Sequence, residues 1–462
     1  MNSIANLARS CTFLLCASLA EGQTIERVSV ATGGGQADGP SGTMGDGNLD
    51  PVSTTRPSLS GDGRFVAFTS AATNLVPSDT NGLPDVFVRD RLLGTTVCAS
   101  TAPNGVPASG PSYHPALSAD GRFVAFVSQA NDLDPSDGYS GADVFIRDLV
   151  SGSTRIISVD PSGNPADGDS GFKWWHLGAP DSAHVTTLVA ISDRGRFVAF
   201  ASRANNLVIG DTSGWDIFVR DLQLGITTRE SVATGGTQAN NDSGMLVGSA
   251  GDVGTGLAIS GDGRIVAFTS KATNLDPIAS LPGVQLFVRN RIAGTTQVAS
   301  VGLNGQLSQR GLYHPSLSAD GRYLAFNTTT PNWVLGDAAS SNNIFLRDLS
   351  LGTTVLVDVL PNGAPAFSSG SADLDDSGRR IVFDCTDGAL LPPDTNAAED
   401  VYFARNLGPL RRISGGIGGS EADAGSYMAA ISGRGNAIAF VSFATNLVPA
   451  DTNGVPDVFV RF

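Results

Sequence analysis

Two copies of one short loop carry oxygen atoms at a spacing that suits a metal ion. The loops read DTNGLPD and DTNGVPD, and each places two acids and an amide around a glycine. Hard cations such as Ca²⁺ take oxygen ligands of this kind. The other copies of the loop diverge, and an Asx turn explains the same residues without a metal. We therefore predict a turn first and a calcium site second, with no other cofactor. The calcium ligands would be Asp79, Asn81, Asp85, Asp451, Asn453 and Asp457.

The least repetitive stretch, residues 160–187, gathers aromatic and basic side chains. It holds two of the four tryptophans, and Trp215 follows in a loop that is expected to open on the same face. Exposed Trp beside polar groups is typical of a platform for a sugar or a peptide. Alternatively, the two tryptophans of this stretch pin the long loop onto the protein or plug a channel. The candidate ligand-binding residues are Lys173, Trp174, Trp175, His176, His184, Trp215, His114 and His314.

Catalytic motifs are otherwise absent from the sequence. It contains no G-x-S-x-G elbow, no H-E-x-x-H and no phosphate-binding loop. A pair of carboxylates across a channel mouth would escape this search, because residue spacing does not reveal such a pair. We therefore favour a non-enzymatic protein over an enzyme, and assign no catalytic residue.

A nine-residue pattern, S-x-D-G-R-x-V-A-F, recurs seven times and defines the elements that must position these residues. Its glycines repeat at about 58 residues, with insertions before the third and fourth copies. The copies begin at Ser60, Ser118, Ser192, Ser260, Ser318, Asp375 and Ser432. Seven matching units favour a closed ring over a solenoid, whose end repeats would need to differ from the others.

Each unit reads as four strands. A D-G turn joins the first two strands, and the third reads D-V-F-V-R-D. Four-stranded units repeated around an axis predict an all-β, seven-bladed β-propeller. The arginine of the third strand recurs in all seven copies, which indicates a structural bond between blades rather than a single site.

The last unit ends after three strands, whereas the chain begins with a lone fourth strand. We therefore expect residues 24–31 to pair with the C-terminal blade, 428–462, and to close the ring. The propeller would form one domain over residues 21–462. His114 and His314 begin the inner strands of blades two and five. These blades lie almost opposite each other, so we expect two structural histidines that do not share a metal.

The S-x-D-G-R-x-V-A-F and D-V-F-V-R-D motifs resemble the WD-like repeats of TolB-type β-propeller proteins. The resemblance covers nearly the whole chain after the first 20 residues. It implies the propeller architecture and an extracytoplasmic binding role, although TolB itself has six blades and an additional domain. The oligogalacturonate lyases, a related seven-bladed group with a His-rich metal site, suggest the alternative of a carbohydrate-active enzyme.

The chain has 462 residues, a formal net charge of −15 and a short apolar start. Arg9, the apolar run 11–20 and small residues before Glu21 predict a signal peptide over residues 1–20 and a secreted or periplasmic protein. The acidic charge argues against nucleic acid, and no later run is long enough for membrane insertion. Cys98 and Cys385 lie in separate strand patterns and are expected to be buried thiols. We expect a monomeric binding or scaffold protein that recognises a protein or a carbohydrate through the loop-rich face near blades two to four.

Overall fold

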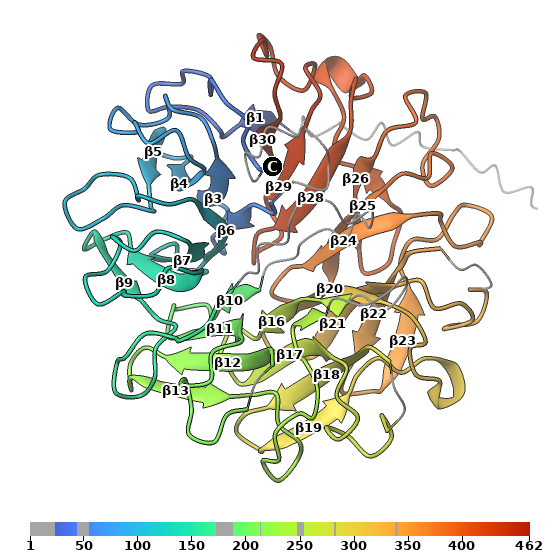
Figure 1. The fold of residues 1–462 in the computed structure, drawn as a ribbon. Coiled ribbons are helices and arrows are strands. Elements are labelled where there is room, and N and C mark those ends of the chain that lie inside the picture. The colour runs from blue at the N-terminus through green and yellow to red at the C-terminus, as the bar shows by residue number, and fades with distance from the viewer. Residues whose placement is uncertain are drawn as a thin grey trace, which may run out of the picture.

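Seven antiparallel sheets stand around a central axis, which confirms the predicted all-β, seven-bladed propeller (Figure 1). The computed structural model describes residues 24–43, 55–171, 188–212, 214–246, 254–280, 283–337 and 341–462. The predicted signal peptide over residues 1–20 lies outside these residues. Within the described residues, no helix is long and apolar enough to cross a membrane.

The blades follow one another in chain order, and each runs from an inner to an outer strand. Blade one contains β2 (Ser58–Leu59), β3 (Phe65–Ser70), β4 (Asp85–Asp90) and β5 (Thr95–Cys98). Blade two contains β6 (Ser112–Leu117), β7 (Phe123–Ser128), β8 (Asp143–Asp148) and β9 (Ser153–Ile156). Blade three contains β10 (Val189–Ile191), β11 (Phe197–Ser202), β12 (Asp216–Asp221) and β13 (Ile226–Arg229). Blade four contains β16 (Leu257–Ile259), β17 (Ile265–Ser270), β18 (Gln285–Asn290) and β19 (Thr295–Val298).

The remaining three blades complete the ring. Blade five contains β20 (Leu312–Leu317), β21 (Tyr323–Thr328), β22 (Asn343–Asp348) and β23 (Thr353–Leu356). Blade six contains β24 (Ser369–Leu374), β25 (Arg380–Cys385), β26 (Asp400–Arg405) and β27 (Arg411–Arg412). Blade seven contains β28 (Ser426–Ile431), β29 (Ile438–Ser442), β30 (Asp457–Arg461) and β1 (Ile25–Arg27). Two short 3₁₀ turns, η2 (Leu303–Gly305) and η3 (Ile417–Gly419), lie between blades.

The first and last described segments share blade seven, as predicted. In Figure 1 the dark blue β1 lies beside the red β30, and the two strands pair in antiparallel register from Ile25 opposite Arg461. The pairing continues past β1, where the N–H of Val28 donates to the carbonyl of Val458 at 2.8 Å. The ring therefore closes without leaving an exposed edge on β30.

The D-G turns need glycine for two reasons. Gly121 has a φ of +71°, in the left-handed region that favours glycine. In addition, a Cβ at Gly121 would come within 2.4 Å of the ring of Phe65 in the preceding blade. The turn is therefore a packing surface as well as a chain reversal, which explains why the glycine recurs in every repeat.

Apolar side chains of adjacent blades form the cores between the sheets. Ala67 and Val88 of blade one, for example, lie in one buried cluster with Val124 and Phe126 of blade two. Both faces of the central strands are buried, as their near-continuous apolar sequences predict.

The recurrent arginine of the third strand binds the preceding blade. A guanidinium nitrogen of Arg220 donates to the carbonyl of Asp160, and Arg347 donates to the carbonyl of Val301. Arg89 and Arg289 donate to the equivalent carbonyls of Ala31 and Ala233, and Arg461 donates to the carbonyl of Ile413, also in the preceding blade. In these five blades the structural prediction for the arginine is confirmed.

The insertion before blade four adds two short strands at the inner edge of blade five. β14 (Met245–Leu246) pairs with β15 (Gly254–Thr255), and β15 runs parallel to the start of β20. Cys98 and Cys385 are both free and buried, as expected.

Candidate functional site

The five candidate binding residues of the first insertion, Lys173, Trp174, Trp175, His176 and His184, lie outside the described residues. Their role as a ligand platform stays a prediction. The sixth candidate, Trp215, is only 7% exposed and packs in the core cluster between blades three and four. The expectation of an exposed Trp215 is therefore wrong. Trp215 directly precedes β12, where its side chain lies between the sheets of blades three and four.

His114 and His314 occupy matching β-bulges in β6 and β20. Both have a positive φ, of 54° and 51°, and both are buried. Burial lowers the pKa of His114 to about 4, so its imidazole is neutral at physiological pH. Neither belongs to a group of three potential metal ligands within the described part of the chain.

The two DTNG loops form Asx turns. Asn81 accepts the N–H of Leu83 at 2.9 Å, while its amide nitrogen donates to Asp85 and to the carbonyl of Ala108. Asn453 accepts from Val455 and donates to Asp457 and to the carbonyl of Ala37 in the same way. The side chains of both asparagines are thus committed to the turn.

In blade seven an arginine lies between the two acids of the loop. Arg27 lies 3.0 Å from the Asp451 carboxylate and 3.2 Å from that of Asp457, and all three side chains are largely buried. A similar arrangement occurs in blade six, where Asp394, Asp400 and Glu421 form the one group with metal-ligand spacing among the described residues. There Arg412 contacts Asp400 at 3.1 Å and Glu421 at 2.9 Å.

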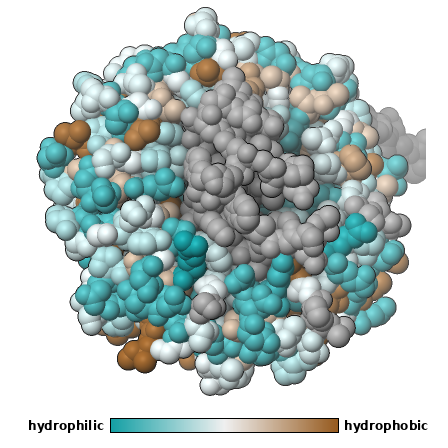
Figure 2. All heavy atoms as spheres, viewed as in Figure 1, coloured by the Kyte–Doolittle hydropathy of each residue, from teal (hydrophilic) through white to brown (hydrophobic). Residues whose placement is uncertain are grey.

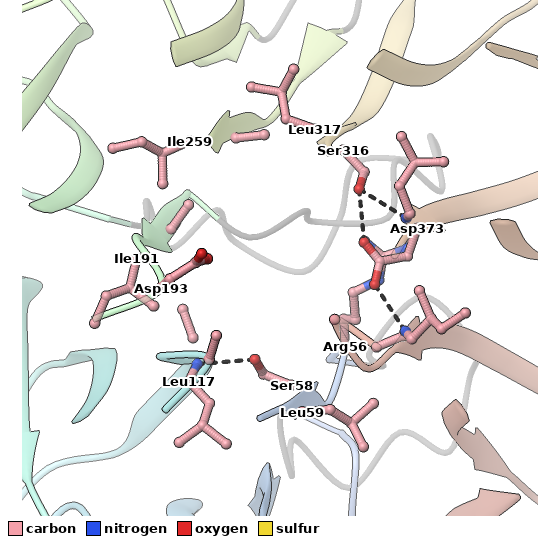
Figure 3. Close-up of a pocket in the computed structure, with 18 of the residues that line it drawn as sticks. Arg56, Ser58, Leu59, Leu117, Ile191, Asp193, Ile259, Ser316, Leu317 and Asp373 are labelled. Carbon is pink, nitrogen blue, oxygen red and sulfur yellow. Dashed lines mark hydrogen bonds and ion pairs between the residues drawn. The ribbon is translucent and has the colours of Figure 1, made fainter. Parts of the chain in front are cut away.

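The inner strands of all seven blades line a central channel with a cavity of about 240 Å³. Figure 3 shows apolar side chains around it, among them Leu59, Leu117, Ile259 and Leu317. Polar groups interrupt this lining at a few positions, and these positions differ from blade to blade. The channel is therefore seven-fold in its backbone but not in its chemistry.

One wall of the channel carries a bonded polar cluster. Asp373 accepts a hydrogen bond from the Ser316 hydroxyl at 2.8 Å and another from the N–H of Ile431 at 2.9 Å (Figure 3). Arg56 lies 3.7 Å from the Asp373 carboxylate and donates to the carbonyl of Ala372. These bonds join blades one, five, six and seven, so the cluster stabilises the ring.

A closed circle of backbone hydrogen bonds surrounds the channel at the D-G turns. In each blade a backbone N–H of the second or third motif residue donates to the carbonyl of the second motif residue in the next blade. The bonds run Gly61 to Ala119, Asp120 to Asp193, Asp193 to Gly261, Gly261 to Ala319, Ala319 to Asp376, Asp376 to Gly433 and Arg434 to Gly61. The circle holds the side chains at these positions around one channel mouth.

Two of these positions carry carboxylates, Asp193 in blade three and Asp376 in blade six. Each lies beside a glycine of the next blade, because a Cβ at Gly261 would come within 2.3 Å of Asp193 and one at Gly433 within 2.4 Å of Asp376. Figure 3 shows the Asp193 carboxylate pointing into the open centre of the channel. Within the described residues neither carboxylate accepts a hydrogen bond or forms an ion pair.

The charge of Asp193 acts on the carboxylate of Asp376. Burial, followed by repulsion from Asp193, raises the pKa of Asp376 to about 6. Burial also raises the pKa of Asp193, with a smaller effect from Asp262. Arg194 lowers the pKa of Asp193 and Arg434 lowers that of Asp376, and in both acids burial has the larger effect.

The sequence reading missed Asp193 and Asp376, although the repeat contains a signal for them. The second position of the S-x-D-G motif is Gly or Ala in the other five copies and Asp in these two alone. A position-by-position comparison of the repeats would therefore have found this pair.

No family model matches the chain, and no curated protein sequence matches it. Solved structures do. An oligogalacturonate lyase in complex with manganese is 12% identical, with a TM-score of 0.53 and coverage of 95% of this chain and 96% of that chain. An oligogalacturonate lyase from Vibrio parahaemolyticus is 11% identical, with a TM-score of 0.52 and the same coverage. At this identity the similarity shows the β-propeller fold alone, and the TolB-type resemblance stays a prediction.

Proposed function

We propose that the protein is an exported, secreted or periplasmic binding module, which holds a basic group of a protein partner at the Asp193–Asp376 mouth. One observation carries the proposal: two carboxylates lie at one channel mouth without a hydrogen bond or an ion pair among the described residues, beside glycines that make room for them. A lysine or arginine side chain entering the mouth would supply the missing positive charge.

The charge of the whole chain supports a cationic partner. A formal net charge of −15 attracts basic surfaces and accelerates their encounter at low salt. The face in Figure 2 is mainly hydrophilic where residues are coloured, with apolar residues scattered singly. The support for a cationic partner comes from the net charge of the chain, since this face lies opposite the Asp193–Asp376 mouth.

A carbohydrate-active enzyme is the second candidate. The observation in its favour is the pKa of Asp376, about 6 beside a second carboxylate. A carboxyl group that is partly protonated near neutral pH can serve as a general acid while its neighbour stays ionised. Oligogalacturonate, named for the similar solved structures, is itself a polyanion and would be repelled here. A neutral or amino sugar would fit this mouth better.

The test compares the double variant Asp193→Asn, Asp376→Asn with the wild-type protein on an array of basic, neutral and acidic peptides. Asp320→Asn serves as the matched control, because Asp320 lies in an equivalent D-G turn and is exposed to solvent. We expect tight, salt-sensitive binding to basic peptides, at least tenfold weaker in the double variant and unchanged in the control. Equal binding by all three proteins would refute the proposal. Cleavage of a glycan by the wild-type protein, lost in the double variant, would favour the enzyme instead.

A further inference from the structure

Every blade places one residue of its fourth strand beside the start of its third strand. We call this place the pocket of the blade. That fourth-strand residue pairs with the third residue of the third strand. It is an arginine in three blades: Arg229 opposite Phe218, Arg412 opposite Tyr402 and Arg27 opposite Phe459.

Each of these arginines neutralises buried acids. Arg27 contacts Asp451 and Asp457, Arg412 contacts Asp400, and Arg229 contacts Asp211 at 2.5 Å. The arginine side chains are only 10–13% exposed. A buried carboxylate needs a partner of this kind, because removing an unpaired charge from water is costly. The same pocket thus holds a cation three times in one chain.

Blades four and five lack both the arginine and the strand acid. Val298 and Leu356 stand in the arginine position, and the first residue of the third strand is Gln285 or Asn343. The Asn343 amide donates to Asp358 at 2.9 Å. In both blades a neutral amide replaces the carboxylate at the start of the third strand. Blade five nevertheless keeps two buried acids, Asp337 and Asp358, and its Asp358 accepts hydrogen bonds from Asn343 and Ser369.

Blade one keeps both acids but has no arginine. Cys98 pairs with Phe87 in the arginine position. Asp79 is 6% exposed, and within the described residues its two oxygens are buried without a hydrogen-bond partner. Burial raises the pKa of Asp79, and the backbone N–H of Asn81 partly offsets this. Asp85 is fully buried and accepts only from the neutral side chains of Ser100 and Asn81. No ion pair reaches either acid within the described residues.

We propose that Asp79 and Asp85 of blade one bind a calcium ion in the place that an arginine side chain fills in blades three, six and seven. Two carboxylates offer the hard oxygen ligands that Ca²⁺ prefers, with backbone carbonyls and water to complete the shell. Asn81 is not a ligand, since both ends of its amide are used in the turn.

Cys98 is not among the proposed ligands. Its buried Sγ lies 3.5 Å from the hydroxyl of Ser100, which in turn bonds to Asp85. Blade two has comparable acids, Asp137 and Asp143, but Asp137 is partly exposed, so water reaches it and the proposal is confined to blade one.

The test uses the full chain after treatment with a chelator. Ca²⁺ is titrated by calorimetry, and the melting temperature is measured with and without it. We expect saturable binding and a rise of about 3 °C at a hundredfold excess over Kd. If the wild-type protein shows no heat of binding and no shift in melting temperature on addition of Ca²⁺, the proposal is overturned. In that case the two acids share a proton, and Asp79→Asn in chelator would melt above the wild type.

Exchange variants locate the ion. Cys98→Arg supplies the side chain found in the three sister pockets, and Asp79→Asn removes a ligand, so both should abolish the calcium shift. Cys98→Ala is the matched control and should retain it. The reverse change, Arg229→Cys, should create a calcium site in blade three and so add to the calcium dependence of the protein's melting temperature. A shift that persists in Asp79→Asn places the ion elsewhere and overturns the proposal, even if Cys98→Arg fails to fold.

Discussion

The loops of residues 79–85 and 451–457 differ at one position in seven, yet they lie in different electrostatic environments. Both form the same Asx turn, with the asparagine bonded two residues ahead and to a carbonyl of the following segment. In blade seven Arg27 joins the two acids, whereas in blade one Cys98 stands in its place. The local sequence therefore determines the turn. The fourth strand, which is β1 in blade seven and β5 in blade one, determines whether a positive charge lies beside the two acids.

Removing the fourth strand of blade seven should have the largest effect on this pair of loops. A chain lacking residues 24–31 loses the hydrogen bonds of β1, the buried Val28 and Val30, and the cation between Asp451 and Asp457. We expect a loss of 5 kcal/mol or more in the free energy of unfolding, roughly the whole stability of a typical domain. Chemical denaturation followed by circular dichroism measures it. Moving residues 24–31 behind Phe462 through a short linker should restore stability, because the other six blades join their third and fourth strands in this way.

Exchanging only the arginine is the next test. Arg27→Met leaves two buried acids without a cation and should cost about 3–5 kcal/mol, as the loss of one partner of a buried pair does. Cys98→Ala should cost about 1 kcal/mol, since it removes only a small buried group. Urea unfolding compares the two variants. Equal losses would show that Arg27 contributes packing rather than charge.

In chelator, Asp85 of the blade-one loop should make the stability of the wild-type protein depend on pH. Burial raises the pKa of Asp85 to about 7, above its value in the unfolded chain. The folded state therefore binds more protons between pH 4 and pH 7, and stability falls as the pH rises through this window. The fall is on the order of 3 kcal/mol and should be smaller in Asp85→Asn. Melting temperatures from pH 4 to pH 8 for both proteins provide the measurement, and parallel curves would contradict the expectation.

The smallest effect should be the same in both loops. Asn81→Ala and Asn453→Ala each remove an Asx turn and two hydrogen bonds from the side-chain amide. We expect losses of about 1–2 kcal/mol in each, because a net hydrogen bond contributes about 1 kcal/mol. Thermal unfolding of the two variants compares them directly. A much larger loss at one site would show that the turns are not equivalent.

The repeat carried most of the fold prediction. The D-G turns, the four-stranded units and the closing strand follow from local patterns that recur seven times, so errors in one copy are corrected by the others. The structural role of the third-strand arginine followed from the same recurrence. The position of Trp215 did not, because a tryptophan in a loop looks exposed until the neighbouring blade covers it.

The candidate site was harder to predict, because it depends on contacts between blades. Asp193 and Asp376 come from blades three and six and share a mouth only because the ring brings them together. Arg27 and Asp457 are more than 400 positions apart in the chain. The predicted closing strand already placed both residues in blade seven. In blades three and six, the pairing of a fourth-strand arginine with buried acids can be recognised only once the register between the third and fourth strands is known.

The register of β1 against β30 also determines how the ring responds to force. Ile25 lies opposite Arg461, and the N–H of Phe462 donates to the carbonyl of Thr24, so both ends emerge at the same end of the strand pair. Pulling Thr24 away from Phe462 would load the hydrogen bonds of this pair one after another, as in a zipper, rather than all at once in shear. Blade seven should therefore open at low tension, before any of the six blades whose strands follow one another without a break.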